Sequence, residues 1–293
     1  MMGRYAAGIV LYNPEKERLK KNIDAVCGQV EKVYCYNNGL QKVDEINALL
    51  SDYKNLRVIG TGKNVGIATA LNELVKEAAK DDIEWILTLD QDSVVCDGMV
   101  MALASLKDEK NAAIICPVIE DVRRKNEAPA VVKNTVEDVN FCITSGSFMS
   151  VKKTIEVGGF DEKLFIGLVD DEICYKIRKN GYRIIRNEAV VLNHELGNLT
   201  PSKYESFYLR IGEILHSDTI KKLSYKRTVS PMRLYYATRN MVYLNKKYPQ
   251  ENMSWSTKKL LYNSVSSLLR GKKKISLIKS IVSGIIDGKT MDA

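Results

Sequence analysis

Two aspartates separated by one glutamine follow an apolar run in the segment LTLDQDSVV, residues 87–95. Side chains two residues apart in an extended chain point the same way, so Asp90 and Asp92 would hold two like charges close together. Such a pair is stable only where a cation or hydrogen-bond donors compensate it. A divalent metal bound to phosphate oxygens is one such partner, because hard cations prefer oxygen ligands. A turn that ends a strand is the alternative interpretation of the triplet.

A second acidic group opens the segment VDDEICYKIRKNGYRI, which is predicted to be a helix followed by a strand. The helix macrodipole favours acidic residues in a first turn, which readily explains one of Asp170, Asp171 and Glu172 but not all three. Gly181 is expected to end the helix, and the strand after it delivers His194. These side chains are candidates for acid–base or metal chemistry, with helix capping and a structural histidine as the alternatives.

Four short runs of β-forming residues, at 4–11, 32–36, 56–60 and 83–89, predict buried strands. Between them, apolar residues recur at three- and four-residue steps, which predicts amphipathic helices. Strands that alternate with helices in this way form a parallel sheet with helices on both faces. Ligands bind such sheets beyond the carboxyl ends of the strands, so the two aspartates are expected inside a ligand crevice.

The six cysteines of this 293-residue chain are far apart in the sequence, with no C-x-x-C pair. Neither a zinc site nor a disulfide framework is predicted, and a reducing cytoplasm fits best. The apolar start of the chain is too short for a signal peptide and is interpreted as the first strand. No other run approaches the roughly 20 apolar residues of a membrane-spanning helix.

Basic residues are concentrated in the last third of the chain. Residues 200–293 carry 18 Lys and Arg against 6 Asp and Glu, whereas residues 1–199 carry 26 against 30. The pattern there is helical, and residues 258–286 alternate long aliphatic side chains with basic ones. These helices are predicted either to lie on an anionic membrane surface or to pack as a lid or oligomer contact, and both interpretations stay open.

Eight segments with family-like motifs follow one another along the chain. They are VLYNP (10–14), YNNG (36–39), KNVGIATALN (63–72), LTLDQDS (87–93), ITSGSFMS (143–150), GGFDEKLFIGLVDDEICYKIRKNGY (158–182), NHELGN (193–198) and SPMRLYYATRNMVYL (230–244). With these motifs the chain resembles the inverting nucleotide-sugar glycosyltransferases of glycosyltransferase family 2. Within that family it is most similar to bacterial rhamnosyltransferases that build cell-surface polysaccharides.

The resemblance implies an α/β protein of the GT-A fold, with a Rossmann-like, mostly parallel sheet flanked by helices and a helical, basic C-terminal extension. It implies a catalytic domain at residues 1–200, with nucleotide-sugar binding in about 1–95 and the acceptor side in about 96–200. Residues 201–293 would form the helical region, with membrane association as one expectation.

The resemblance also assigns roles to individual residues. Asp170 falls at the position of the catalytic base, and Asp92 and His194 fall at positions that hold Mg²⁺ or Mn²⁺ on the donor diphosphate. The acceptor side is assigned to Ser145, Gly146 and Glu172. Donor or nucleotide binding is assigned to Tyr12, Asn13, Asn38, Asn64, Gly66, Asp90, Gln91 and Arg239.

Two positions depart from the family pattern. Asn37 stands where the family commonly has Asp before Asn-Gly, so recognition of the base would depend on a neutral amide. Gly167 stands where rhamnosyltransferase-like members often carry Asp after LFI. The second departure bears on acceptor and sugar specificity more than on the chemistry.

The predicted function is metal-dependent transfer of a sugar, with inversion, to a hydroxyl of a lipid-linked or saccharide acceptor, and dTDP-L-rhamnose is the favoured donor. The cation would stabilise charge on the leaving diphosphate, and Asp170 would take the proton of the attacking hydroxyl. The protein is expected in the cytoplasm, with peripheral attachment to the inner face of the cell membrane and a homo-oligomer as further expectations.

Three other functions are alternatives. A transferase of another nucleotide sugar, such as a UDP-hexose, differs only in its donor. A sugar-phosphate nucleotidyltransferase would need a glycine-rich loop after the first strand, which VLYNPEKERLKK does not provide. A basic nucleic-acid-binding protein would use residues 200–293, but their basic residues are interleaved with aliphatic ones and no recognition helix is evident. No nucleic-acid partner is therefore expected.

Overall fold

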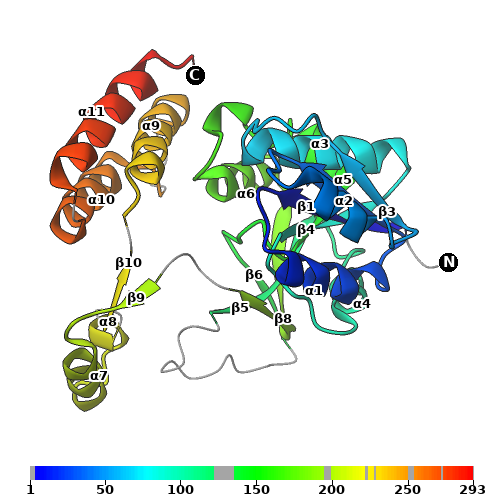
Figure 1. The fold of residues 1–293 in the computed structure, drawn as a ribbon, viewed down its shortest axis with the longest axis horizontal. Coiled ribbons are helices and arrows are strands. Elements are labelled where there is room, and N and C mark those ends of the chain that lie inside the picture. The colour runs from blue at the N-terminus through cyan, green and yellow to red at the C-terminus, as the bar shows by residue number, and fades with distance from the viewer. Residues whose placement is uncertain are drawn as a thin grey trace. The chain divides into compact units, whose positions relative to one another are not determined.

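The computed structural model describes residues 4–121, 135–194, 199–221, 224–227, 229–249, 254–271 and 273–292. The chain divides into two compact units, Met1–His194 and Glu195–Ala293, and Figure 1 shows the ribbon of both. Each unit has a hydrophobic cluster of its own.

The first unit alternates strands and helices, as the sequence predicts. Its strands are β1 (Tyr5–Leu11), β2 (Lys32–Asn37), β3 (Leu56–Ile59), β4 (Trp85–Asp90), β5 (Ala112–Asp121), β6 (Val136–Asp138), β7 (Ser147–Ser150) and β8 (Arg183–His194). Its helices are α1 (Lys16–Cys27), α2 (Val43–Leu50), α3 (Ile67–Lys80), α4 (Met99–Ala104), α5 (Val151–Glu156) and α6 (Val169–Lys179), with a short 3-10 helix at Glu162–Leu164. The four strands predicted before residue 91 are confirmed to within two residues.

The strands form one sheet in the order β3-β2-β1-β4-β7-β5-β8-β6. The pairs β2–β3, β1–β2, β1–β4 and β5–β8 are parallel, whereas β7 runs antiparallel to both its neighbours and β6 runs antiparallel to β8. Leu11 pairs with Asn37, and Val10 pairs with Asp90. The loops that follow β1, β2 and β4 therefore leave the sheet at the same edge.

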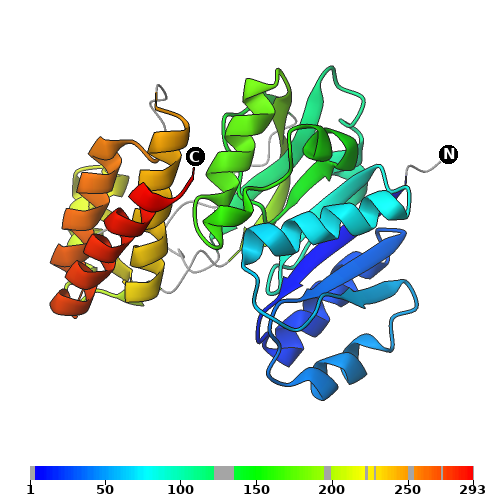
Figure 2. The same cartoon turned by 90° about the horizontal axis from the view of Figure 1, so that it is seen from above.

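Helices cover both faces of this sheet (Figure 2). The alternating side chains of β1 explain why: Ala7, Ile9 and Leu11 pack with residues of α1, α2 and α4 in one buried cluster. On the opposite face Gly8 leaves room for α3, since a Cβ there would lie 3.2 Å from Leu74. Both faces of β1, β2 and β4 are buried, which explains why the sequences of these strands are nearly continuous apolar runs.

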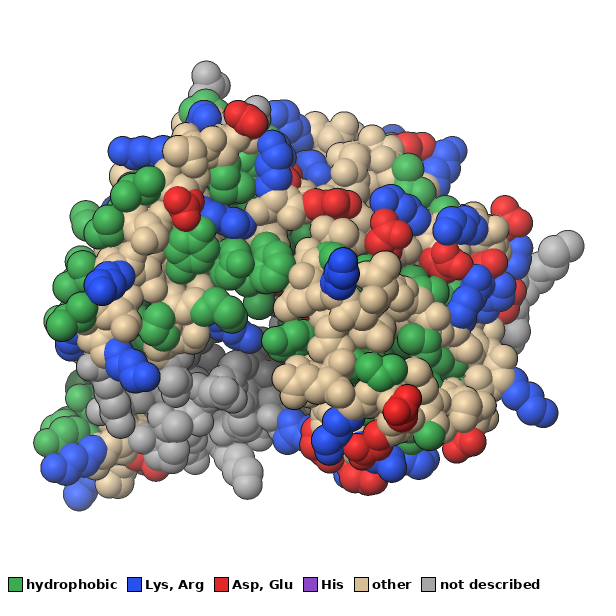
Figure 3. Space-filling model, turned by 45° about the horizontal axis from the view of Figure 1, so that its top comes forward, with side chains coloured by type: hydrophobic (Ala, Val, Ile, Leu, Met, Phe, Trp, Pro, Cys, Tyr) green, Lys and Arg blue, Asp and Glu red, His purple; other side chains and the backbone are tan. Residues whose placement is uncertain are grey.

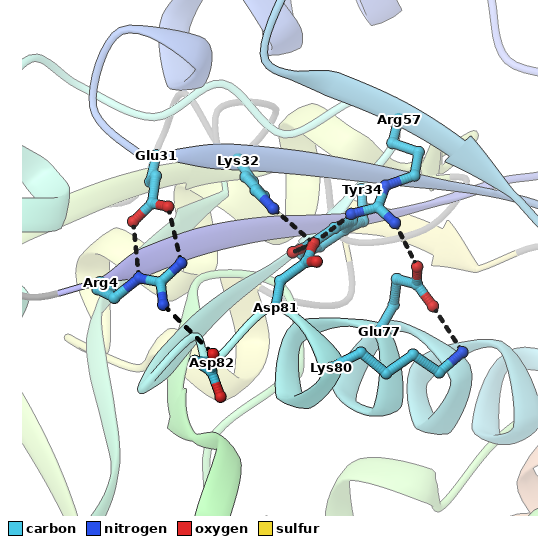
Figure 4. A network of polar contacts seen from close by, with 9 residues as sticks. All are labelled: Arg4, Glu31, Lys32, Tyr34, Arg57, Glu77, Lys80, Asp81 and Asp82. Carbon is cyan, nitrogen blue, oxygen red and sulfur yellow. Dashed lines mark hydrogen bonds and ion pairs between the residues drawn. The ribbon is translucent and has the colours of Figure 1, made fainter.

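A network of charged residues holds the edge of the sheet where β1, β2 and β4 begin, as Figure 4 shows. Asp81 is its centre: it accepts a hydrogen bond from the Tyr34 hydroxyl at 2.7 Å and pairs with Lys32 Nζ at 2.8 Å and with Arg57. Arg57 also pairs with Glu77 at 2.6 Å. These contacts lower the pKa of Asp81 to about 2. This edge lies opposite the loops that follow the strands, so the network stabilises the sheet and takes no part in the site described below.

The second unit is mostly helical, as predicted, with one short antiparallel strand pair that the sequence analysis did not anticipate. Its elements are β9 (Leu199–Pro201), α7 (Glu205–Ile214), α8 (Asp218–Lys221), β10 (Tyr225–Arg227), α9 (Pro231–Lys247), α10 (Thr257–Arg270) and α11 (Lys274–Thr290). Gly284 and Gly288 let α11 approach α9 closely, because a Cβ at either position would lie under 3.0 Å from the α9 backbone. Among the described residues, no helix is both long and apolar enough to span a bilayer.

Candidate active site

The loop after β4 is tied to the loop after β1 by one side chain. Gln91 accepts a hydrogen bond from the Tyr12 backbone N–H at 2.8 Å and donates one to the Tyr12 carbonyl at 3.2 Å. The amide thus fixes the aspartate loop against the first loop, and the Tyr12 ring stays half exposed. Gln91, assigned to the donor side by resemblance, has a positioning role here.

Amide side chains organise the loops on the nucleotide side. Asn38 Oδ1 accepts from the Val65 N–H at 2.8 Å and joins the end of β2 to the turn before α3. Asn64 Oδ1 accepts from the Gly66 N–H at 3.1 Å within that turn. Asn13 Oδ1 accepts from the Gln41 N–H at 2.7 Å. Four residues predicted to bind the donor are therefore brought to one edge of the sheet.

A cavity of about 450 Å³ opens between the loop after β1 and the segment after β2. It is lined by Asn13, Pro14, Glu15, Lys16, Glu17, Leu40, Gln41, Lys42, Glu45 and Ile46. The amide and aliphatic groups can accept a planar polar ring, but three glutamates stand against two lysines, so the lining has no excess of positive charge for an anion. Asn37, the residue that departs from the family pattern, does not line this cavity, because its Oδ1 accepts from the Gly39 and Leu40 N–H groups at 3.2 and 3.0 Å.

The backbone of Asp90 is fixed from two sides. Its carbonyl accepts from Asn22 Nδ2 at 2.6 Å, and its N–H donates to Ser145 Oγ at 3.1 Å. Ser145 lies 2.8 Å from Ser93 Oγ, and both serines are buried. Ser145, predicted to border the acceptor, is thus a support for the aspartate loop. Its neighbour Gly146 is also packed tightly: a Cβ there would lie 2.7 Å from the Leu192 side chain.

Asp170, the predicted base, lies in the first turn of α6 and comes close to Asp90. Burial raises the pKa of Asp170 to about 7, and the charge of Asp90 adds to the rise, while a hydrogen bond with Thr144 opposes it. Carboxylates from β4 and α6, 80 positions apart in the sequence, therefore share one electrostatic environment. A carboxylate with a pKa near neutrality is suited to accept a proton.

Asp92 is exposed at this edge, and its carboxylate has no partner among the described residues. Val94, two residues later, forms an isolated backbone bridge with Asn193, the residue before His194. The bridge brings the end of β8 beside the aspartate loop. The backbone of His194 ends β8, paired with that of Asp121, but its side chain lies outside the described part of the structure.

These residues fit a divalent cation in their chemistry. The negative charge of Asp90 disfavours ionisation of Asp170, and a bound cation would relieve this repulsion. The exposed carboxylate of Asp92, two residues after Asp90, offers oxygen ligands for such a cation. Among the described side chains, no three His, Cys, Asp or Glu residues already form a metal-binding group. A cation would therefore need ligands from the donor phosphates or from His194 in addition.

Glu172 does not face the site directly. Its side chain is fully buried, and its carboxylate lies 3.3 Å from Lys176 Nζ one turn along α6. Lys176 also donates to the Gly159 carbonyl. This arrangement ties α6 to the glycine turn before it, and the acceptor-side role of Glu172 stays a prediction.

The turn before α6 packs against the start of α3. Gly66 has φ +86°, and a Cβ there would lie 2.6 to 2.8 Å from Phe165 atoms, including its carbonyl oxygen. The Ile67 N–H donates to that carbonyl at 2.6 Å. Phe165 and Leu168 both have positive φ, 53° and 61°, so the turn that carries Asp170 is strained as well as tightly packed.

Arg239 lies in α9 of the second unit. Its guanidinium donates to Asn240 Oδ1 at 2.8 and 3.0 Å and lies over the Tyr236 ring. These contacts of the Arg239 side chain are all with residues of the second unit. Its predicted contact with a phosphate of the donor therefore stays a prediction.

Three features of the site were missed by sequence reasoning. Asn22 and Thr144 hold Asp90 and Asp170, yet neither stands out from its polar neighbours in the sequence. Three cysteines that are far apart in the sequence converge beside α6: Cys142 Sγ lies 3.8 Å from Cys174 Sγ, and Cys116 is near enough to shift the pKa of Cys142. Cys142 lies in an irregular segment before β7 and Cys174 in α6, so no sequence pattern indicated this contact.

Comparisons with known proteins agree with this geometry. A family model described as Glycosyl transferase family 2 matches residues 7–160. The chain is 26% identical over 304 residues to dTDP-rhamnosyl transferase RfbF of Shigella flexneri, and the match covers 96% of this chain and 94% of that protein.

Solved structures share the fold. TarS 1–349 of S. aureus superimposes with a TM-score of 0.55 at 15% identity, covering 98% of this chain and 89% of that one. The mannosyltransferase PcManGT of Pyrobaculum calidifontis, solved with GDP-Man and Mn²⁺, gives a TM-score of 0.52 at 15% identity, covering 98% and 86%. The predicted GT-A fold is thus confirmed, and the chain belongs to glycosyl transferase family 2, which makes it a glycosyltransferase.

Proposed function

We propose that this glycosyltransferase moves L-rhamnose from dTDP-L-rhamnose to a hydroxyl of a lipid-linked or saccharide acceptor, with inversion and with a divalent cation. The observation that carries the mechanism is the environment of Asp170. It is a carboxylate with a pKa raised to about 7, beside the aspartate loop that follows β4.

Different residues of the first unit bind the nucleotide, the phosphates and the cation. The loops of Tyr12, Asn13 and Asn38 surround the nucleotide, and the cavity beside Asn13 receives the base. Asn64 and Gly66 shape the start of α3, and the positive end of that helix dipole would favour the phosphates. Asp92 and His194 hold Mg²⁺ or Mn²⁺, and the bound cation offsets charge on the departing diphosphate.

Asp170 acts on the acceptor. Its carboxylate accepts the proton of the attacking hydroxyl while the sugar–phosphate bond breaks on the other side of the anomeric carbon. A single displacement inverts that carbon and needs no covalent intermediate. Thr144, by its hydrogen bond to Asp170, orients the base toward the acceptor side.

The donor assignment is supported by the relative from Shigella flexneri, whose name states dTDP-rhamnosyl transfer and which matches along nearly the whole chain. A UDP-hexose is the second candidate. The cavity beside Asn13 is lined by amides, lysines, glutamates and aliphatic residues, and its amides can hydrogen-bond a thymine or a uracil equally well.

A donor panel tests the proposal. The purified chain is incubated with Mn²⁺ and, separately, dTDP-L-rhamnose, dTDP-glucose, UDP-glucose and GDP-mannose, and thermal unfolding and slow donor hydrolysis are measured. Protection and hydrolysis should be greatest with dTDP-L-rhamnose. A response to UDP-glucose alone would reject rhamnose and keep the transferase, and a response to none would reject the nucleotide-sugar site.

We further propose that the second unit attaches the enzyme to an anionic membrane surface, where a lipid-linked acceptor would be found. Its last two helices expose apolar side chains at helical spacing, namely Leu261, Val265 and Leu269 on α10 and Ile275, Ile278, Val282 and Ile286 on α11. Exposed lysines at 258, 259, 273, 274 and 279 flank them. Figure 3 shows hydrophobic and basic side chains intermingled on this unit, at the left of the view. Such a surface binds acidic headgroups and the acyl boundary together.

Vesicle flotation distinguishes this attachment from an oligomer contact. Binding is expected to vesicles that contain phosphatidylglycerol and to be lost with neutral phosphatidylcholine alone. Leu269→Glu with Ile275→Glu should abolish it, whereas Met101→Glu, an exposed apolar position in the first unit, should not. If the double variant instead converts a dimer to a monomer and never alters flotation, the surface is an oligomer contact and the membrane proposal fails.

A further inference from the structure

Three cysteines meet beside the helix that carries Asp170. Cys116 lies in β5, Cys142 in the loop before β7, and Cys174 in α6. Cys142 is the centre of the group: its Sγ lies 3.8 Å from Cys174 Sγ and 3.3 Å from Ser147 Oγ, and Cys116 is near enough to shift its pKa. All three are free thiols.

Cys142 differs from its two neighbours in access and in charge. It is partly exposed, whereas Cys116 and Cys174 are 4% and 2% exposed. Hydrogen bonds from Cys116 and Cys174 hold the pKa of Cys142 well below its usual range, and the same contacts raise the pKa values of the two buried thiols. The thiolate is the nucleophilic form of cysteine, so Cys142 is the one prepared to react.

We propose that Cys142 and Cys174 form an oxidation site, at which hydrogen peroxide converts the two thiols to a disulfide. The contact between their sulfur atoms carries the proposal. A disulfide bond is about 2.05 Å long, so the two sulfurs, now 3.8 Å apart, must approach by roughly 1.8 Å for the bond to form. Cys174 also donates to the Cys142 carbonyl at 3.5 Å, so its thiol already points toward this residue.

The reaction has two balanced steps. The Cys142 thiolate attacks one peroxide oxygen, the S–O bond forms, the O–O bond breaks, and hydroxide leaves and takes a proton to become water. Cys174 then attacks the sulfur of the Cys142 sulfenic acid: the S–S bond forms, the S–O bond breaks, and the thiol proton leaves with the hydroxyl as a second water. Two electrons pass from the sulfur pair to the peroxide.

The new bond would join two parts of the site. Cys142 is two residues before Thr144, which holds Asp170, and Cys174 is one turn of α6 beyond Asp170. A disulfide would fix this loop to the helix and remove the negative charge of Cys142, which contributes to the raised pKa of the base. Loss of sugar transfer on oxidation is therefore expected. This expected loss rests on the proposed function, whereas formation of the disulfide does not.

Peptide mapping tests the site without reference to activity. The native full-length chain is treated with hydrogen peroxide, remaining thiols are alkylated, and proteolytic peptides are analysed by mass spectrometry. A linked peptide pair containing Cys142 and Cys174 is expected, and dithiothreitol should release it. Cys96→Ser, an exposed cysteine outside the group, should leave the link unchanged.

Two variants at Cys174 test its role as the resolving thiol. Cys174→Ser and Cys174→Ala should both abolish the link and leave Cys142 as a trapped sulfenic acid that reacts with dimedone, and circular dichroism checks that each is folded. A wild-type chain that oxidises at Cys96 but keeps Cys142 and Cys174 as thiols would overturn the proposal. So would a link from Cys142 to Cys116 instead. If the disulfide forms yet transfer persists, the oxidation site stands and only its effect on the enzyme is rejected.

Discussion

The side-chain amide of Gln91 forms two hydrogen bonds with the backbone of Tyr12, at 2.8 and 3.2 Å, across 79 residues of sequence. The middle residue of the aspartate triplet thus connects the β4 loop to the β1 loop. The two aspartates on either side of it can keep one geometry because the residue between them is held.

Replacing Gln91 by Ala should therefore loosen the donor site rather than the chemistry. Each lost hydrogen bond is expected to cost about 0.5–1.5 kcal/mol. The donor KM should rise about tenfold while kcat changes by less than about threefold, since about 1.4 kcal/mol is a factor of ten in binding. Initial-rate kinetics with the preferred donor measure both constants. An unchanged KM would show that the connection does not matter for donor binding.

Asp170→Asn removes the proposed base and keeps the shape of the side chain. Transfer should fall by about 10²–10⁴-fold, the usual contribution of a general base, while donor affinity stays within about threefold. Calorimetric binding and transfer assays separate the two effects. If transfer is retained, another group accepts the proton.

The same residue should make stability depend on pH in the absence of metal. Its pKa rises from the ordinary 3.8 to about 7 on folding, so the folded state prefers the protonated form. This group therefore costs no stability below pH 3.8, and its cost grows as the pH rises and is complete above about 7. The melting temperature of Asp170→Asn minus that of the wild type should increase over this range. A constant difference would contradict the raised pKa.

Asp92→Ala tests the metal site. Its exposed carboxylate has no partner in the described residues, so its loss should leave folding intact and weaken Mn²⁺-dependent donor binding. The effect should be at least the roughly 10–100-fold that follows loss of an outer-shell partner of a metal. Asp97→Ala, exposed in the same loop, is the control. Equal Mn²⁺ responses in both variants and the wild type would exclude Asp92 as a ligand.

Much of the site follows from sequence pattern because parallel strands carry their loops to one edge. The position of Asp90 was predictable in this way, because it ends a parallel strand, whereas Asp170 lies in helix α6 and was assigned to the site by the family resemblance. Asn38 and Asn64 were assigned to one site by the family resemblance, and the hydrogen bond from the Val65 N–H to Asn38 joins their two loops.

Side-chain direction was not predictable from the same patterns. Glu172 belongs to an acidic triplet, but helical rotation turns it into the protein, where Lys176 pairs with it. Cys142 lies in an irregular segment with no periodicity, so nothing in the sequence indicates that it touches Cys174, 32 residues later. Contacts that depend on loop conformation need coordinates, whereas contacts that depend on strand register do not.

Gly66→Ala should separate backbone strain from close packing at the start of α3. The position has φ +86°, and a Cβ would lie within 2.8 Å of Phe165 backbone atoms. Gly158→Ala is a matched control, because it has φ +85° with nothing within 4 Å of a Cβ. The control should lose about 1–2 kcal/mol from strain alone, and Gly66→Ala about 1–3 kcal/mol more, as for overpacking. Urea unfolding measures both, and equal losses would show that Phe165 yields without cost.

The network at the opposite edge of the sheet should set the acid limit of stability. Contacts with Lys32, Tyr34 and Arg57 lower the pKa of Asp81 from 3.8 to about 2, so the ionised form is favoured on folding. Its contribution is present above pH 3.8 and is lost as the pH falls through about 2. At neutral pH, Asp81→Asn should therefore cost about 1–2 kcal/mol, an amount that reflects a carboxylate 19% exposed. Asp82→Asn, whose side chain is 88% exposed and 3.7 Å from Arg4, should cost almost nothing. Urea denaturation at several pH values gives the comparison, and matching losses in the two variants would mean that the contacts of Asp81 add no stability.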